Sequence, residues 1–476
     1  MKTINNKKTV RKSRLVDSMR TKDSLTENGC VTHSTSNNAC VDLFFIAGAS
    51  RTMVEKTIIN MFVKALNENP LVAMKILFWA RDIRGGEGER RFFRVIAKYL
   101  DENYPKQFKK NIKFIPEYGR WDDMFELDEK FTLPLIVKGL RNDEVNGLLA
   151  KWLPRQGEFA NKVRKHMGLT PKGYRKMVVA LSNTIEQKMS SGEFGAIEYD
   201  KIPSLAMNKY RKAFFRNDEA RFKEFLGAVE KGEKKIHAST LTPLDLYVSY
   251  SRGEDKRAVE VQWNALPDYM KDSKERVLPM CDVSESMGRD MAMAASISLG
   301  IYISERNRGL FKNAFMTFTS EPTLQYLTGS FYERINQIKG PRGYNTDLIK
   351  AFLYLLSTAI KHNLPESEMP TKILIISDME FDGNEGRQSI VKADDTAYEA
   401  IVKNYKVAGY KVPQIVFWNV RGREDNVPVK VSMKGVGLVS GYNPSKLPAI
   451  IKGEIETPEQ LMLKIINSER YSLITV

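Results

Sequence analysis

The chain has 476 residues, 42% of them hydrophobic, and is therefore long enough for roughly two to four domains with separate cores. No run of about 18 apolar residues occurs, and the basic, polar start is not followed by an apolar segment, so we expect neither a membrane span nor a signal peptide. Three cysteines without metal-ligand spacing predict a reduced, cytoplasmic protein, and four histidines leave little material for a histidine-rich metal site or a Ser–His catalytic pair.

The net charge of +16 is concentrated in the first part of the chain. Residues 276–476 contain 24 Lys and Arg against 22 Asp and Glu, so a net charge of +14 lies in residues 1–275. Residues 151–235 alone hold 19 basic and 10 acidic side chains. A basic surface attracts phosphate polymers, and we therefore expect RNA as a partner. A surface that serves only solubility is the alternative.

Residues 1–40 are rich in Lys, Asn, Ser and Thr and predict a flexible basic arm. From residue 41 to residue 275, apolar residues recur at helical spacing and β-branched alternating runs are scarce. The clearest helical stretches are 71–83, 90–104, 141–153, 172–190, 205–227 and 243–250. Helix pairs without strands between them indicate stacked helical hairpins, as in a HEAT-like α-solenoid that is either open or closed into a ring.

The pattern changes at residue 276, where short β-rich runs begin to alternate with helical segments. We predict strands at 277–281, 311–318, 372–377, 414–420 and 435–441, and helices at 290–305, 346–362, 394–408 and 445–466. This alternation predicts a doubly wound α/β domain over 276–476, with a mostly parallel sheet and helices on both faces. Ligands of such sheets bind at the carboxyl ends of the strands.

Oxygen-bearing side chains follow two of these strands. Asp282 ends the first strand, and Ser284 and Ser286 follow at positions that point the same way in an extended loop. Thr346 begins a predicted helix, and Asp378 ends the third strand. Five hard oxygen donors favour Mg²⁺ over zinc, with Mn²⁺ or Ca²⁺ as alternatives. Because only two of the donors are carboxylates, the ion would keep positive charge and an open position for an acidic partner.

The stretch DVSESMG (282–288) resembles the D-x-S-x-S metal-ion-dependent adhesion motif of von Willebrand factor A domains, and Thr346 and Asp378 match the separate threonine and aspartate of that motif. The resemblance implies that the serines and the threonine ligate the metal, that the aspartates act directly or through water, and that an acidic side chain of a partner completes the coordination sphere. Glu380 and Asp382 continue Asp378 as D-M-E-F-D, where they would tune the charge of the metal or contact solvent.

Segments of the basic half resemble an uncharacterised family related to the Ro ribonucleoprotein, which joins a helical-repeat TROVE-type domain to a C-terminal von Willebrand factor A domain. The similar segments are FWARDIRGGEGERRFFR (78–94), RWDDM (120–124), YDKIPSLAMNKYRKAFFRND (199–218), STLTPLDLY (239–247) and VQWNALP (261–267). The resemblance implies a ring or arc of helices with a basic lining that takes single-stranded RNA ends, and a structured RNA bound on the outside.

Basic side chains interleave with aromatic ones in RRFFR (90–94) and KYRKAFFR (209–216), a combination that holds single strands through phosphate contacts and base stacking. The phenylalanines, at helical spacing, are predicted to lie in the core, and Arg120, Trp121 and Asp122 to form a buried structural cluster. We expect RNA contacts among the flanking cations, some of which would instead pair with acidic side chains. The candidates are Arg81, Arg84, Arg90, Arg91, Arg94, Lys209, Arg211, Lys212 and Arg216.

The sequence contains no Walker-type phosphate loop, no D-x-D phosphatase motif and no nucleophile–base pair, so we predict a monomeric binding protein rather than an enzyme. The first hypothesis is a Ro-type RNA-binding protein with a metal site for a partner. The second is an adaptor that grips an acidic protein through the metal, with the basic half as a second protein surface. The third is a metal-dependent nuclease that uses Asp282, Asp378, Glu380 and Asp382.

Overall fold

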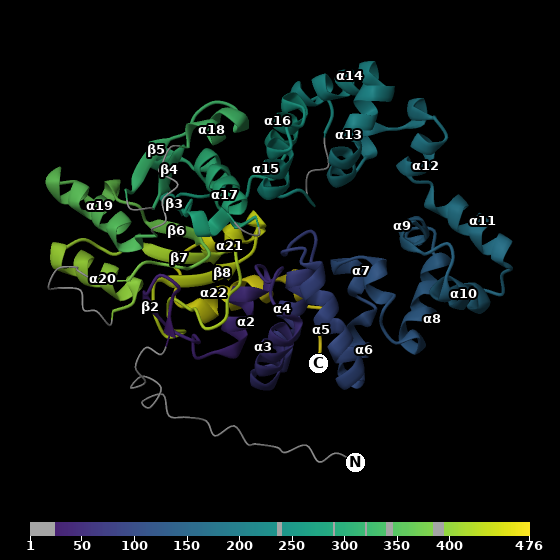
Figure 1. Ribbon diagram of the computed structural model, residues 1–476, viewed down its shortest axis with the longest axis horizontal. Coiled ribbons are helices and arrows are strands. Elements are labelled where there is room, and N and C mark those ends of the chain that lie inside the picture. The colour runs from purple at the N-terminus through teal and green to yellow at the C-terminus, as the bar shows by residue number, and fades with distance from the viewer. Residues whose placement is uncertain (1–23, 236–239, 289–290, 319–320, 339–345, 384–394) are drawn as a thin grey trace, which may run out of the picture.

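The computed structural model describes residues 24–235, 240–288, 291–318, 321–338, 346–383 and 395–476 (Figure 1). Within these residues, a helical region runs from α2 (Ala39–Ala47) to α16 (Lys256–Asn264), and an α/β domain follows from β3 (Val277–Cys281) onward. This is the predicted combination of an α-helical N-terminal region with a C-terminal α/β domain. None of the helices in the described ranges is long and apolar enough to cross a membrane.

A six-stranded sheet forms the centre of the α/β domain, in the order β5-β4-β3-β6-β7-β8. The strands after β3 are β4 (Ala314–Thr317), β5 (Thr323–Tyr326), β6 (Lys372–Ser377), β7 (Gln414–Asn419) and β8 (Val436–Ser440). All neighbours pair parallel except β5, which runs antiparallel to β4 at one edge. Every residue of β3, β4, β6 and β8 is buried, which explains why these strands appear in the sequence as continuous apolar runs.

The predicted strands agree with the sheet except at one edge. Those at 277–281, 372–377, 414–420 and 435–441 match β3, β6, β7 and β8 to within one residue at either end. The strand predicted at 311–318 begins only at Ala314, because Asn313 adopts a left-handed backbone with φ 65°. The sequence analysis missed β5, whose residues are half-buried or exposed at the edge and do not form a buried apolar run.

Helices alternate with most of the strands of the α/β domain. They are α17 (Ala292–Arg306), α18 (Phe331–Gln337), α19 (Leu348–Lys361), α20 (Ala397–Ala408), α21 (Leu447–Ile451) and α22 (Pro458–Ile466). α17 contacts β3, β4 and β6, and α22 contacts β8. The single helix predicted at 445–466 is divided into α21 and α22, because Gly453 adopts a positive φ of 78° and the Thr457 side chain caps a new helix by accepting from the Gln460 N–H.

The helical region contributes to two hydrophobic cores. Between α2 and α16 it comprises α3 (Glu55–Glu68), α4 (Pro70–Arg81), α5 (Arg90–Asn103), α6 (Pro105–Ile112), α7 (Ile115–Tyr118), α8 (Glu129–Leu140), α9 (Asn146–Trp152), α10 (Glu158–His166), α11 (Pro171–Ser182), α12 (Ile185–Ser190), α13 (Ser204–Asn217), α14 (Glu219–Glu230) and α15 (Pro243–Ser251). Buried residues of α2–α7 and α13–α16 belong to the same core as the sheet, whereas α8–α11 enclose a smaller core of their own. The helices predicted at 172–190 and 205–227 are interrupted at Asn183 and at Asp218.

Both ends of the helical region contact the α/β domain. At one end α2 packs on β8 and α4 on α22, and at the other end α15 packs on α17 and α16 on α18. Figure 1 shows the helices between these ends extending away from the sheet through α8–α11 and returning through α13 and α14. The middle helices therefore form an arc that is anchored at both ends; that this arc is a HEAT-like solenoid stays a prediction.

The loop between α4 and α5 joins the helical region to the α/β domain through a buried ion pair. The Glu87 carboxylate lies 2.5 Å from the Lys446 ammonium, and both side chains are buried. The same carboxylate accepts hydrogen bonds from the backbone N–H groups of Tyr442 (2.9 Å) and Asn443 (3.2 Å). Gly441 has φ +100°, and a Cβ there would lie 1.8 Å from Glu87 Oε2. Only glycine therefore allows the carboxylate to approach this closely.

A second carboxylate of the same loop binds the C-terminal segment. Asp82 is buried and accepts from Arg470 Nη2 at 2.7 Å and from the Tyr471 hydroxyl at 3.0 Å. The carbonyl of Gly86 accepts from the Asn443 side-chain amide at 2.6 Å. The glycine-rich stretch of the sequence is therefore a docking loop for the α/β domain.

We expect Glu87→Ala to lower the free energy of unfolding by about 3–5 kcal/mol, because it leaves the Lys446 ammonium buried without a carboxylate. Urea denaturation followed by circular dichroism measures this. The matched control is Glu117→Ala, which removes an exposed carboxylate 3.6 Å from Arg470 and should cost about 1 kcal/mol or less. Equal, small losses from the two substitutions would contradict the assigned role of Glu87.

Candidate metal and ligand site at the carboxyl edge of the sheet

Asp282 and Asp378 follow two neighbouring parallel strands, β3 and β6. Cys281 lies opposite Ile376, and the Asp282 N–H donates to the Ile376 carbonyl at 3.0 Å. The chain leaves β3 for β4 on one side and later returns to β6 on the other side, so the connections diverge between these two strands. Ligands of open α/β sheets bind beyond the carboxyl ends of the strands at such a switch point. The structure places both carboxylates there.

Asp282 is fully buried, and both of its carboxylate oxygens accept hydrogen bonds. One carboxylate oxygen accepts from the Ser284 N–H at 2.9 Å and the other from the Ser377 hydroxyl at 2.7 Å. The hydroxyl oxygens of Ser284 and Ser286 lie 3.0 Å apart, where the chain enters the 3₁₀ turn η5 (Glu285–Gly288). Asp282, Ser284 and Ser286 therefore lie together.

The described residues offer the charge of Asp282 no cationic partner. Burial, and next the charge of the neighbouring Asp378, raise the pKa of Asp282 to about 7. Within the described residues, no Lys, Arg or His side chain forms an ion pair with this carboxylate. A buried carboxylate costs free energy unless a proton or a cation neutralises it. Together with the Ser284 and Ser286 hydroxyls it is a hard oxygen donor set, so these residues fit a divalent cation such as Mg²⁺.

Asp378 already contacts cationic side chains of the chain itself. Its Oδ2 atom lies 3.2 Å from Arg423 Nη2 and 4.0 Å from Arg421 Nη1. The Arg423 guanidinium also pairs with Glu380, at 3.4 Å, and with Glu27. Asp378 would therefore act on a cation at Asp282 mainly through its charge.

Arg421 and Arg423 were missed by the sequence analysis. A signal was present, because RGRE follows the predicted strand at 414–420 directly and β7 is the parallel neighbour of β6. Basic side chains at that position arrive at the same edge of the sheet as the carboxylates that follow β6.

Thr346 lies among groups other than the serines. Its hydroxyl donates to the Glu380 carbonyl and accepts from the Asn28 side-chain amide at 2.9 Å. Asn28 also donates to the Glu380 carbonyl at 3.0 Å, and the Asn28 carbonyl accepts from the Gly383 N–H at 3.1 Å. The structure therefore ties Thr346 to the segment that follows Asp378 and to a residue from the start of the chain.

We call residues 24–33 the N-terminal strap, because they cross the carboxyl edge of the sheet. The strap forms a short hairpin of β1 (Ser24–Leu25) and β2 (Val31–Thr32), and His33 makes an antiparallel bridge with Val427. Residues 24–40 were predicted to belong to a flexible arm, which is wrong: buried strap side chains such as Thr26 and Thr32 bond to the α/β domain. The rest of the predicted arm, residues 1–23, lies outside the described residues.

The carboxylates of the nuclease hypothesis are not gathered round one point. Glu380 is buried and accepts from the Asn426 amide at 2.8 Å, besides its pair with Arg423. The Asp382 N–H donates to the Thr346 carbonyl at 3.0 Å. In the described part of the chain, no three His, Cys, Asp or Glu side chains are arranged to hold a metal ion together. The candidate cation site consists of one carboxylate and two hydroxyls.

The RNA-contact candidates on α4 and α5 are engaged by acidic side chains. Arg81 is buried and lies 2.7 Å from Asp123. Arg94 contacts both Asp122 (2.9 Å) and Asp123 (2.8 Å), and Arg90 contacts Asp122 at 2.5 Å. Because Arg81 is buried, it cannot contact RNA, and its prediction as an RNA contact is wrong. The predicted buried cluster of Arg120, Trp121 and Asp122 is only half-buried, and the buried carboxylate beside it is that of Asp123.

Two further candidates in this part of the chain also have protein partners. Arg91 donates to the Met53 carbonyl at 2.7 Å and lies 3.6 Å from Glu55. Arg84 is exposed and donates to the Glu117 carbonyl at 2.8 Å. The phenylalanines between these arginines, Phe92 and Phe93, are buried in the core, as expected.

The candidates on α13 have a different environment. Lys209, Lys212 and Arg216 are exposed, and within the described residues none of them pairs with a carboxylate. Arg211 is buried and pairs with Glu254. Phe214 is buried with the core, whereas Phe215 is only half-buried and lines a pocket with the cations.

Comparison with known families assigns the chain without assigning a function. Residues 26–129 and 142–275 match the family described as "Domain of unknown function (DUF2828)". The chain belongs to the DUF2828 family. Residues 276–471 match a second description, "Domain of unknown function (DUF7788)". The two matches meet between residues 275 and 276, where the sequence changes from helices to alternating strands and helices.

This DUF2828 protein is similar along most of its length to a viral protein. An uncharacterized protein of Acanthamoeba polyphaga mimivirus is 29% identical over an aligned length of 505 residues, gaps included. The matched region covers 93% of this chain and 87% of the viral one. The similarity therefore spans both the helical region and the α/β domain.

If the site takes a divalent cation, Mg²⁺ will raise the melting temperature of the metal-free protein, because binding to the folded state adds stability. Asp282→Asn should abolish this rise without lowering the melting temperature in chelator, since it removes a buried charge beside Asp378. The matched control is Glu285→Gln, an exposed carboxylate in the same loop. Differential scanning calorimetry in EDTA and in Mg²⁺ measures both effects. A rise that persists in Asp282→Asn would place the cation elsewhere.

Proposed function

We propose that this protein binds single-stranded RNA through the arc of its helical region, and that its carboxyl-edge site holds a divalent cation that receives an acidic side chain of a protein partner, in the cytoplasm. The RNA part rests on one observation: Arg81, Arg90, Arg91 and Arg94 on α4 and α5 contact carboxylates, whereas a group of exposed cations on α10, α11 and α13 has no carboxylate partner among the described residues. Unpaired, exposed cations are the ones that can neutralise phosphates.

Seven exposed cations without a carboxylate partner among the described residues lie on three helices of the arc. They are Lys165 on α10, Lys172, Arg175 and Lys176 on α11, and Lys209, Lys212 and Arg216 on α13. They account for much of the excess positive charge of residues 151–235. Sequence-independent binding of a single strand needs such charges together with aromatic surfaces, and half-buried Phe215 supplies one on α13.

The anchoring of the arc supports the same proposal. Because both ends pack on the α/β domain, the spacing between α11 and α13 does not depend on a free terminus, and a bound strand would meet cations at fixed positions. This matches what the resemblance to the Ro ribonucleoprotein implies. The resemblances to the Ro ribonucleoprotein and to von Willebrand factor A domains remain proposals, because both matched families are described only as domains of unknown function.

The carboxyl-edge site favours a second candidate function, an adaptor that binds an acidic protein and no RNA. The observation behind it is the Asp282 carboxylate without a cationic partner among the described residues, beside two hydroxyls. A cation held there would supply positive charge and a coordination position for a carboxylate of the partner. The two functions are compatible because they use different parts of the chain.

We expect a fluorescein-labelled single-stranded RNA of about 20 nucleotides to bind with an affinity that falls steeply with salt, with a slope of about −0.7 per phosphate contacted. The triple variant Lys172→Glu, Arg175→Glu, Lys176→Glu should bind at least about tenfold more weakly in fluorescence anisotropy, because it reverses three exposed charges on α11.

The matched control reverses three exposed lysines of the α/β domain, Lys312→Glu, Lys361→Glu and Lys406→Glu, and should bind RNA nearly as the wild type does. Equal losses in the two triple variants would show that net charge, not the arc, governs binding. No binding at low salt by folded wild-type protein would leave the adaptor as the better account.

A further inference from the structure

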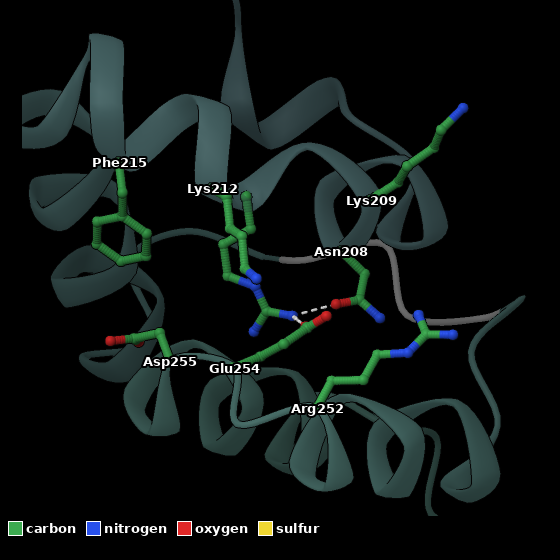
Figure 2. A pocket seen from close by; sticks show the side chains of 8 residues that line it. Asn208, Lys209, Lys212, Phe215, Arg252, Glu254 and Asp255 are labelled. Carbon is green, nitrogen blue, oxygen red and sulfur yellow. Dashed lines mark hydrogen bonds and ion pairs between the residues drawn. The ribbon is translucent and has the colours of Figure 1, made fainter.

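A pocket of about 500 Å³ lies between α13 and the turn that joins α15 to α16 (Figure 2). Its lining residues are Asn208, Lys209, Arg211, Lys212 and Phe215 from α13 and Arg252, Glu254 and Asp255 from the turn. In Figure 2, Phe215 and Asp255 lie at one end of the pocket and Lys209 and Arg252 at the other. Its volume is in the range of natural small-ligand sites.

Arg211 is a buried cation of this pocket with an unused donor group. Its side chain is 3% exposed, and its Nη2 atom donates to Glu254 and to the Asn208 side-chain carbonyl. Its Nη1 atom is buried and has no hydrogen-bond partner among the described residues. A buried guanidinium N–H without an acceptor is costly, and native structures rarely leave one unsatisfied. Its position in the pocket lining indicates an acceptor supplied by a ligand.

The charges around Arg211 favour an anion. The two carboxylates of the pocket are already used, since Glu254 pairs with Arg211 and Asp255 caps α16 by accepting from the Ala258 N–H at 2.8 Å. Lys212 and Arg252 are exposed at the rim and form no ion pair with the described residues. The pocket therefore keeps an excess of positive charge. Burial lowers the pKa of Arg211, although Glu254 and Asp255 act in the opposite direction.

The pocket is held by contacts that do not depend on a ligand. The Tyr332 hydroxyl, from α18 of the α/β domain, donates to the Glu254 carbonyl at 2.9 Å. On the other wall, the Asn208 amide donates to the Ser249 hydroxyl at 2.8 Å. Both walls are therefore positioned before binding, which reduces the ordering cost for a ligand.

Phe215 gives one end of the pocket an aromatic surface. One side of its ring packs edge-on against Phe222, with ring centroids 4.9 Å apart, and the side chain is half-buried while it lines the pocket. Nucleobases stack on such aromatic surfaces whatever their identity. The pocket thus combines a cationic end with a stacking surface.

We propose that this pocket binds a nucleoside monophosphate unit, with the phosphate at Arg211 Nη1, Lys212 and Arg252 and the base against Phe215. A phosphate monoester carries a charge of about −1.5 to −2 and three acceptor oxygens, which suits a buried guanidinium flanked by two further cations. The unit comes either from the phosphorylated end of a single-stranded RNA or from a free nucleotide. Only the RNA source rests on the proposed function.

The test is isothermal titration calorimetry of the full chain with AMP, adenosine and inorganic phosphate. AMP should bind at least about tenfold more tightly than adenosine.

Arg252→Ala and Lys212→Ala, both on the exposed rim, should each weaken the binding of AMP by about tenfold or more, the size expected for losing a hydrogen bond to a charged group. Arg211→Gln should do the same, and the rim variants keep the test valid if this buried substitution impairs folding. The matched control is Lys223→Ala on α14, exposed and outside the pocket, which should leave AMP binding unchanged.

A second experiment distinguishes an RNA end from a free nucleotide as the ligand. It also tests the pocket proposal separately from the proposed RNA-binding function. Ten-nucleotide RNAs that carry a 5′-phosphate, a 3′-phosphate or only hydroxyl ends are compared by anisotropy. A preference for one phosphorylated end that Arg252→Ala removes would identify an RNA end as the ligand. AMP binding without that preference would identify a free nucleotide, and AMP binding without any RNA binding would keep the pocket and remove the proposed function. RNA binding without AMP binding, or AMP binding unaffected by all three pocket variants, would overturn the pocket proposal.

Discussion

The buried ion pair of Glu87 with Lys446 is the contact on which the relation between the two parts of the chain depends. Taking two charges out of water is unfavourable. The pair is stable because the Glu87 carboxylate also accepts from the N–H groups of residues 442 and 443, and because Gly441 has no side chain to block its approach. Nearby, Glu89 binds Arg51, whose guanidinium lies 4.3 Å from the centre of the Tyr442 ring. This short loop, together with the packing of α2 on β8 and of α4 on α22, therefore fixes where the arc of helices begins relative to the sheet.

Charged side chains that are paired within the chain have a structural role. Charged or polar groups that the chain leaves unpaired can bind a ligand. Asp122 and Asp123 bind three arginines of α4 and α5, namely Arg81, Arg90 and Arg94. Arg423 binds the carboxylates that follow β6. Two buried groups that the described residues leave unsatisfied lie at the proposed sites: the Asp282 carboxylate at the sheet edge, which has no cationic partner there, and the Nη1 atom of Arg211 in the α13 pocket. One is an uncompensated negative charge and the other an uncompensated donor, and they suit a cation and a phosphate respectively.

Most of the α/β domain was predictable because parallel strands buried on both faces leave continuous apolar runs, and because the carboxyl ends of such strands lie at one edge. This reasoning places Asp282 and Asp378 side by side. It could not place the N-terminal strap, whose polar composition is that of an unstructured arm, and whose order comes from hydrogen bonds to residues more than 300 positions away. Nor could the sequence show that Arg81 is unavailable to RNA while Lys212 is exposed. Both residues lie in basic, aromatic stretches, and only the fold brings Asp123 against Arg81.

The most direct test of the account is a map of where RNA touches the protein. A single-stranded RNA that contains 4-thiouridine is crosslinked to the full chain, and the modified peptides are identified by mass spectrometry. The account predicts adducts in peptides of α10, α11 and α13, together with the turn around Arg252. Adducts confined to α4 and α5 or to the α/β domain, or no adducts at low salt, would contradict it.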